Sequence, residues 1–310
     1  MKRILSLDGG GIRGLIPALV LAAIESKTGK PVAHCFDLIA GTSTGGILAL
    51  GFSRDDGNGR PRYTANDLAK IYRKRGKDIF SRSFWKGVSS VGGFADELYS
   101  HDGLEAVLEE YFGEDTLGSC LTDTLITSYD IQNRRPLFFK SWKAAHSAVL
   151  CRHAARATSA APTFFEPARV TVDGAMQNLV DGGVFMNSPS VSAYTEARRL
   201  YPGEDILVVS IGTGELVRPI DHREARDWGR LGWLLPLLSC MFDGVADAAD
   251  YQMSTLLGER YIRLQTDLTT ASDDMDDVSN GNIENLTQEA RKLMRSHKRQ
   301  LEAIVQLLAS

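Results

Sequence analysis

Short apolar runs alternate along this chain with longer segments of helical period. Runs of strand length cover residues 3–7, 35–40, 124–129, 136–140, 206–211 and 261–264. Helical periodicity covers residues 15–27, 188–200 and 283–308. Strands that are separated by helices are typical of α/β proteins. The pattern therefore predicts a central sheet with helices between its strands.

The first and last helical segments differ in polarity. Residues 15–27 are apolar on nearly every side, which predicts a buried helix. The last segment has a solvated basic face, made of Arg291, Lys292, Arg295, Lys298 and Arg299. The most apolar stretch, 15–24, is shorter than the roughly 20 residues that span a bilayer. Any membrane contact is therefore expected to be peripheral.

Two polar segments interrupt the alternation. Residues 53–63 are rich in turn-forming residues, and residues 272–282 are acidic. Both are expected to be solvated surface connectors, and neither has the character of a linker between domains. We therefore expect one domain over residues 1–310, with its core motifs in 2–214 and a C-terminal helical part in 215–310.

Composition narrows the class of protein. The 310 residues are 43% hydrophobic and 24% charged, which is ordinary for a globular protein. The net charge of −4 supplies no basic field for binding a nucleic-acid polymer. The first residues lack the apolar core of a secretory signal, so a cytoplasmic location is expected. The four cysteines, which are Cys35, Cys120, Cys151 and Cys240, are scattered and predict reduced thiols without a metal site.

A glycine run lies between the first predicted strand and the first helix. Gly9, Gly11 and Gly14 match the G-x-G-x-x-G fingerprint of dinucleotide-binding proteins. That motif also needs an acidic residue at the end of a second strand, and Asp37 stands at the start of its strand. The second interpretation is an oxyanion hole, in which exposed amides stabilise an acyl-transfer intermediate. The amides concerned belong to Gly9, Gly10, Gly11, Ile12, Arg13 and Gly14.

A G-x-S-x-G motif follows the second predicted strand and precedes an apolar helix. It consists of Gly41, Thr42, Ser43, Thr44 and Gly45. This strand-turn-helix context is the one that a nucleophile elbow requires. Ser43 would project from the turn at a helix N-terminus, where positive potential favours an alkoxide. The competing interpretation is a plain turn, because small residues often gather in turns.

A serine nucleophile needs a base. The histidines, His34, His101, His146, His153, His222 and His297, do not lie in glycine-framed loops, and structural roles are expected for them. Asp181 is the better candidate because Gly182 and Gly183 follow it directly. A carboxylate can deprotonate a serine if burial raises its pKa and the two groups are within hydrogen-bond reach. Taken alone, Asp-Gly-Gly is also an ordinary turn.

Together, the glycine run 8–14, the elbow 41–45 and the Asp-Gly-Gly loop 181–183 resemble the patatin-like phospholipase family. Residues 157–165 are similar to the segment that precedes this loop in the family, and the resemblance extends from Lys2 to Gly214. It implies that Ser43 is the nucleophile, that Asp181 is its dyad partner and that the glycine loop is the oxyanion hole. It also implies a three-layer α/β/α domain with a mostly parallel sheet, and no metal or other cofactor.

The resemblance implies a phospholipase A type of lipid acyl hydrolase that acts on membrane phospholipid. Two alternatives stay open, namely a nucleotide-responsive regulatory protein and a lipid-binding protein without turnover. Compact bacterial relatives also include antiviral effectors that are activated by cyclic nucleotides, which raises that role as a hypothesis. The sequence does not determine the oligomeric state.

Residues 80–99 are a hypothetical cover over the site. Phe84 and Trp85 lie between Arg82 and Lys86, a mixture that suits a membrane interface. The glycines in this segment would act as hinges. The alternative is that the two aromatic residues belong to the core.

Overall fold

The computed structural model describes residues 1–79, 100–215 and 219–309. The hypothetical cover, residues 80–99, lies outside the described residues. No helix in the described ranges is both long and apolar enough to cross a membrane.

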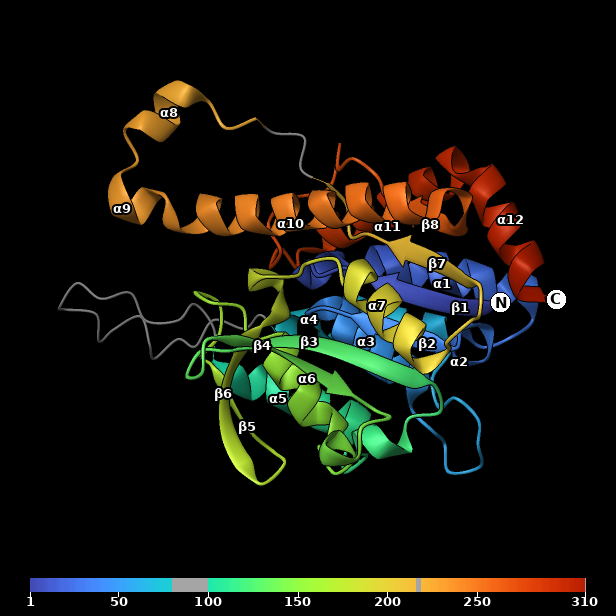
Figure 1. Ribbon diagram of the computed structural model, residues 1–310. Coiled ribbons are helices and arrows are strands. Elements are labelled where there is room, and N and C mark those ends of the chain that lie inside the picture. Colours follow the sequence, from blue (N-terminus) through green and yellow to red (C-terminus); the bar gives the residue numbers. More distant parts are fainter. Residues whose placement is uncertain (80–99, 216–218, 310) are drawn as a thin grey trace.

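Eight strands of the described chain form one central sheet (Figure 1). Their order is β5-β6-β3-β2-β1-β7-β8, and β4 pairs with β3 off this path. The strands are β1 (Lys2–Leu7), β2 (Leu38–Gly41), β3 (Asp123–Asp130), β4 (Arg135–Lys140), β5 (Ala168–Val172), β6 (Ala175–Asp181), β7 (Ile206–Ile211) and β8 (Tyr261–Leu264). β1, β2, β3, β7 and β8 run parallel, whereas β4, β5 and β6 join through antiparallel pairs.

Helices cover both faces of this sheet, as Figure 1 shows. They are α1 (Leu15–Thr28), α2 (Val32–Cys35), α3 (Thr44–Ser53), α4 (Ala65–Ile79), α5 (His101–Phe112), α6 (Cys151–Thr158), α7 (Ser190–Leu200), α8 (His222–Arg226), α9 (Gly229–Gly232), α10 (Leu234–Leu257), α11 (Asn280–Ser296) and α12 (Lys298–Ala309). Two short 3-10 helices, η1 (Gly11–Gly14) and η5 (Gly182–Val184), lie at the candidate site. The structure therefore confirms the predicted three-layer α/β/α fold.

Successive side chains of the central strands point to opposite faces of the sheet, so the hydrophobic core consists of two clusters. Leu5 and Leu7 of β1 pack into a cluster with α1, α3, α4 and α11, whereas Ile4 packs into a second cluster with α7 and α10. Strands that are covered on both faces are apolar at nearly every position. This explains why the central strands read as continuous apolar runs.

Most predicted strands are confirmed, and three local differences have clear causes. The second strand begins at Leu38, because the residues after Pro31 form α2 and include Cys35. The hairpin β5–β6 was missed, although its two-residue turn, Asp173-Gly174, has positive φ at both positions and is a common hairpin sequence. The last predicted helix is two helices, which are interrupted at His297.

The C-terminal part of the chain is not helical throughout, because β8 extends the central sheet beside β7. Its Arg263 forms an ion pair of 2.6 Å with Asp8, and both side chains are largely buried. Arg263 also donates to the Ser210 hydroxyl at 2.8 Å. A buried ion pair is costly to break, because it leaves one charge without its partner. The C-terminal part is thus joined to the start of the glycine loop.

Candidate active site

Ser43 lies at the sharp turn between β2 and α3. Its backbone has φ 54° and ψ −123°, values that are uncommon for a residue with a side chain. Such a conformation directs the side chain away from both the strand and the helix, as a nucleophile elbow requires. The backbone amide of Ser43 donates to the Thr158 hydroxyl at 2.9 Å. Ser43 therefore stands at the carboxyl end of a parallel strand, where α/β proteins commonly place their sites.

The glycines on either side of Ser43 are needed for close backbone approach. A Cβ atom at Gly41 would come within 2.1 Å of the Gly45 carbonyl oxygen. A Cβ at Gly45 would come within 2.3 Å of the Leu7 carbonyl oxygen at the end of β1. Thr44, the first residue of α3, shares a hydrogen bond of 2.6 Å with the Tyr72 hydroxyl. The elbow therefore packs directly against the strand that leads into the glycine loop.

Asp181 reaches the elbow because β3 pairs with both β2 and β6. Gly41 lies opposite Ile126 on one side of β3, and Asp181 lies opposite Ser128 on the other. Asp181 is the last residue of β6 and caps η5, where its Oδ1 accepts the Gly183 amide at 2.7 Å. The sheet register thus brings together two residues that are far apart in the sequence.

Burial sets the chemistry of Asp181, whose side chain is 2% exposed. Burial raises the pKa of Asp181 to about 7, although hydrogen bonds with the Ser43 side chain and the Gly183 amide oppose the rise. A carboxylate with a pKa near neutrality can accept a proton and later return it. The Ser43 side chain is therefore hydrogen-bonded to a buried carboxylate whose pKa lies near neutrality.

Two threonines link the elbow to the Asp181 loop; Thr42 belongs to the elbow motif, whereas no motif indicates Thr127. The Thr42 hydroxyl lies 2.7 Å from the Thr127 hydroxyl and donates to the Met186 carbonyl at 2.8 Å. Thr127 also packs against Gly182, where a Cβ atom would come within 2.1 Å of its hydroxyl oxygen. These contacts hold the turn of Ser43 and the loop of Asp181 at a constant separation.

The glycine loop presents only some of its amides to the site. Gly9 donates to the Asn187 carbonyl at 3.1 Å, Ile12 to Met275 at 2.8 Å and Arg13 to Gly10 at 3.1 Å. The amides of Gly10 and Gly11 have no acceptor in the part of the chain that the structure describes. Both residues line the pocket that also contains Ser43 and Asp181, which is the candidate catalytic pocket. Gly14 packs against Thr44, whose hydroxyl leaves no space for a Cβ atom.

Arg13 lies behind the loop and does not line the catalytic pocket. Its side chain is 5% exposed, and its Nε donates to the Gly10 carbonyl at 3.3 Å. Burial lowers the pKa of Arg13, whereas the charges of Asp243 and Asp273 oppose that change. Arg13 therefore supports the glycine loop from a separate cavity that Asp243 also lines.

Part of the acidic segment 272–282 was wrongly expected to be a solvated connector. The Met275 carbonyl accepts the Ile12 amide, and Met275 lines the catalytic pocket. Gly11 has φ +57°, and a Cβ atom there would come within 2.2 Å of the Met275 carbonyl oxygen. A backbone carbonyl leaves no trace in the pattern of side-chain polarity, so the sequence could not indicate this contact.

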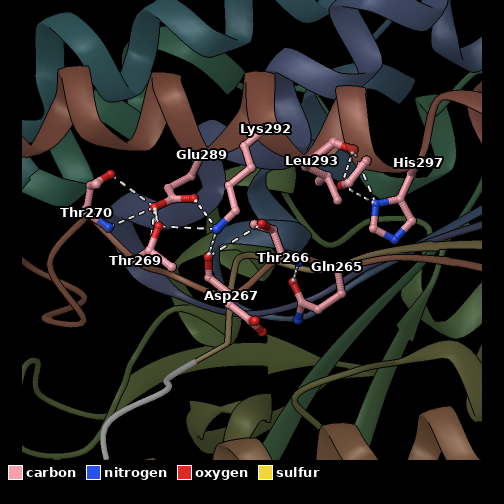
Figure 2. Close-up of polar contacts among 10 residues, drawn as sticks. Gln265, Thr266, Asp267, Thr269, Thr270, Glu289, Lys292, Leu293 and His297 are labelled. Carbon is pink, nitrogen blue, oxygen red and sulfur yellow. Dashed lines mark hydrogen bonds and ion pairs between the residues drawn. The ribbon is translucent and has the colours of Figure 1, made fainter.

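The chain on both sides of Met275 is held by α11, as Figure 2 shows for one side. Glu289 accepts hydrogen bonds of 2.8–3.0 Å from the amides and hydroxyls of Thr269 and Thr270. Lys292 completes this cluster at 3.3 Å from Glu289. On the other side, the Asn282 carboxamide donates to the Asp277 carbonyl at 2.8 Å. The helix thus fixes the segment that contacts the glycine loop.

The candidate catalytic pocket has a volume of about 60 Å³ and is largely apolar. Its walls come from η1, α3, α4, α5, α10 and the segments after α6 and β8. The apolar wall residues are Ile12, Ile47, Tyr72, Ile79, Leu104, Ala161, Phe164, Phe165, Phe242 and Met275. The polar ones are Ser43, Thr44, Ser159, Asp181 and Asn187. A serine and a carboxylate therefore line an otherwise largely apolar pocket.

The histidines lie elsewhere. None of the residues that line the catalytic pocket is a histidine. His146 accepts the Lys140 amide at 3.1 Å, and burial, with nearby lysines, lowers its pKa to about 4. Among the described residues, no group of histidine, cysteine or acidic side chains has the arrangement of a metal site.

The fold is a mixed β-sheet between two layers of helices, and the candidate site lies at the carboxyl ends of the parallel strands. Residues 5–194 match the family model described as patatin-like phospholipase. The chain is 32% identical over 341 residues to patatin-like protein 2 of Oryza sativa subsp. indica, with 95% of this chain and 84% of that protein covered. The match to patatin group J-1 of Solanum tuberosum is 32% over 332 residues, with the same coverage.

The chain belongs to the patatin-like phospholipase family. This membership supports hydrolysis of lipid acyl esters as its activity. Among solved structures, human GIVD cytosolic phospholipase A2 has a similar fold, with a TM-score of 0.50 and 11% sequence identity. The match covers 99% of this chain and 60% of that chain.

Glu289 is expected to stabilise the protein in a pH-dependent way. Burial acts to raise its pKa, but hydrogen bonds from Thr270 and Thr269 outweigh burial and lower the pKa to about 2. A lowered pKa stabilises the folded state at pH values above the pKa of the unfolded chain, which is near 4.5. This stability is lost as the pH falls towards 2. Glu289→Gln should therefore reduce the unfolding free energy by about 3 kcal/mol at pH 7. Urea denaturation at pH 7, 4 and 3 measures this.

The difference between wild type and Glu289→Gln should shrink as pH falls through this range. Glu302→Gln is the matched control, because Glu302 is exposed and its ion pair with Lys298 spans 3.9 Å. A difference that is the same at pH 7 and pH 3 would contradict the predicted role of Glu289.

Proposed function

We propose that this chain is a phospholipase A type of lipid acyl hydrolase that cleaves fatty-acyl esters of membrane phospholipids. Ser43 is the nucleophile in this proposal, and Asp181 is its base. The observation that carries it is the contact between a strained serine and a buried carboxylate whose pKa is about 7. Family membership supports the class of substrate.

The proposed reaction begins with proton transfer from Ser43 to Asp181. The serine oxygen attacks the ester carbonyl, and the amides of Gly10 and Gly11 stabilise the resulting oxyanion. Asp181 then returns the proton to the departing alcohol. In the second half of the reaction, Asp181 accepts a proton from water, and the resulting hydroxide attacks the acyl-enzyme. The bond between the acyl group and Ser43 then breaks, Asp181 returns the proton to the Ser43 oxygen, and the fatty acid leaves.

The pocket walls suit an acyl chain. Next to the catalytic pocket, a small apolar cavity of about 20 Å³ lies between α3, α4 and α5. It shares Ile47, Tyr72, Ile79 and Leu104 with the catalytic pocket. Burial of apolar surface is favourable at about 25 cal/mol per Å², so a long acyl chain gains affinity from these walls. The two cavities together support a lipid ester over a small polar ester.

Peripheral contact with a lipid surface is also part of the proposal, and α10 supports it. In Figure 1, α8, α9 and the adjoining end of α10 project away from the sheet. Phe242 of α10 lines the catalytic pocket, whereas Leu237 and Met241, which precede it on the same helix, and Trp233, just before the helix, are exposed. Exposed aromatic and aliphatic side chains beside a lipid-binding pocket are suited to the interface of a bilayer.

An antiviral role with a cyclic nucleotide as activator is a separate hypothesis, which comes from the family resemblance alone. It is tested by adding cyclic mono- and dinucleotides to the purified protein. A large rise in hydrolysis would support it, and an unchanged rate would argue against it.

Removal of either member of the pair should abolish hydrolysis. Ser43→Ala and Asp181→Asn should each reduce turnover of a fatty-acyl ester to background, and the double variant should lose little more, because residues that act as a unit are not additive. Fluorophosphonate labelling should modify wild type only, which distinguishes a hydrolase from a lipid-binding or regulatory protein. Asp173→Asn, in the exposed β5–β6 turn, is the control. Full activity of folded Ser43→Ala would exclude Ser43 as the nucleophile.

The rate should depend on the ionisation of Asp181. Its raised pKa means that the carboxylate is the minor form below about pH 7 and the major form above it. Because the base must be ionised, kcat/KM should fall about tenfold per pH unit below this pKa and level off above it. Stopped-flow or steady-state rates between pH 5 and 9 on a soluble ester measure the profile. A flat profile across this range would contradict the proposed base.

Two positions on α10 should affect bilayer substrates selectively. Leu237→Ser with Met241→Ser should weaken vesicle binding and hydrolysis of vesicle phospholipid, while hydrolysis of a soluble ester is retained. Tyr251→Ser with Leu256→Ser is the matched control, because both side chains are exposed on α10 but lie two or more turns beyond Phe242. Equal effects of the two pairs on vesicle binding would contradict a lipid surface near the pocket.

A further inference from the structure

We propose that the side-chain carboxamide of Asn187 is a third hydrogen-bond donor to the oxyanion, beside the amides of Gly10 and Gly11. This inference rests on the proposed hydrolase function. Asn187 follows Asp181 by one short loop, which contains η5. A carboxamide is a known type of oxyanion donor in serine hydrolases.

The backbone around Asn187 is fixed at two points. The carbonyl of the preceding residue, Met186, accepts the Thr42 hydroxyl at 2.8 Å. The carbonyl of Asn187 itself accepts the Gly9 amide at 3.1 Å. The first contact leads to the elbow and the second to the glycine loop. Asn187 is therefore held between the two parts of the site that must act on the same ester group.

The side chain of Asn187 lies on the Ser43 side of the glycine loop. A Cβ atom built on Gly9 would be 2.3 Å from Asn187 Oδ1 and 3.3 Å from the Cβ of Ser43. Asn187 Oδ1 and the Ser43 side chain thus approach the same point. Asn187 also lines the cavity behind the glycine loop. The shared approach of Oδ1 and Ser43 to Gly9 shows that the carboxamide lies beside Ser43.

Asn187 differs from the other polar side chains of the pocket in having no partner. Thr44 bonds to Tyr72 at 2.6 Å, and the Ser159 hydroxyl donates to the Ala155 carbonyl at 2.6 Å. Ser43 and Asp181 interact with one another. Across the described residues, the Asn187 carboxamide forms no hydrogen bond, although the residue is only 8% exposed.

Asn187 lines the pocket, so a ligand bound there can reach its carboxamide. Because Oδ1 rests against Gly9, the Nδ2 group is the part that remains for a ligand. An ester carbonyl attacked by Ser43 becomes an anionic oxygen, which is an acceptor for N–H donors. The substrate therefore supplies the acceptor that the protein lacks.

The test compares Asn187→Asp and Asn187→Ala in the purified full chain with a soluble fatty-acyl p-nitrophenyl ester. Asn187→Asp keeps the shape but replaces the donor with a charged acceptor. The hydrogen bond from the Gly9 amide to the backbone carbonyl of residue 187 can form in both variants. We expect kcat to fall by about 10²-fold or more with KM within a few-fold, since the lost bond acts on the transition state. Asn187→Asp should be at least as impaired as Asn187→Ala.

The matched control is Asn178→Asp on β6, whose side chain donates to Gln132; neither residue lines the pocket. Its kcat should stay at the wild-type value. Thermal melting of each variant identifies loss of folding. A kcat near that of wild type in either folded Asn187 variant would overturn the role of Asn187 and leave the proposed hydrolase function intact. A loss confined to KM would also overturn it. Absence of wild-type turnover on any ester would instead overturn the proposed function, and the inference with it.

Discussion

The site depends on the close approach of two backbone turns that follow neighbouring parallel strands. β1 and β2 pair in register up to Leu7 and Gly41, so the turns after them begin side by side. Gly45 then packs on the Leu7 carbonyl, at a distance that a side chain would not permit. Because this contact fixes the elbow relative to the glycine loop, it sets where a nucleophile on Ser43 lies relative to the amides of Gly10 and Gly11.

Burial of Asp181, which removes its carboxyl group from water, raises its pKa. Asp181 is buried, and its hydrogen bonds come from the Ser43 side chain and one backbone amide rather than from a cation. A nearby cation would lower its pKa and weaken it as a base. The buried cation closest in sequence to the glycines, Arg13, lies behind the loop instead. The separation of Arg13 from Asp181 is therefore consistent with a basic carboxylate.

The C-terminal part completes the site from a distance in sequence. β8 carries Arg263 to Asp8, α10 carries Phe242 to the pocket, and the segment held by Glu289 carries Met275 to the glycine loop. The family match ends at residue 194, so these contributions lie beyond it. Arg263 contacts the start of the loop through an ion pair, and Met275 contacts it through a backbone carbonyl.

The sequence alone determined the α/β class, most strands, and the glycine, elbow and Asp-Gly-Gly motifs, because strand periodicity and close turns require particular residues at adjacent positions. It did not show which amides of the glycine loop are free, since Ile12 donates to the carbonyl of Met275, a residue far along the chain. It also gave no sign of Thr127 or of the unpaired carboxamide of Asn187. Their roles arise from sheet register and burial, and these depend on contacts between distant segments that only the tertiary structure decides.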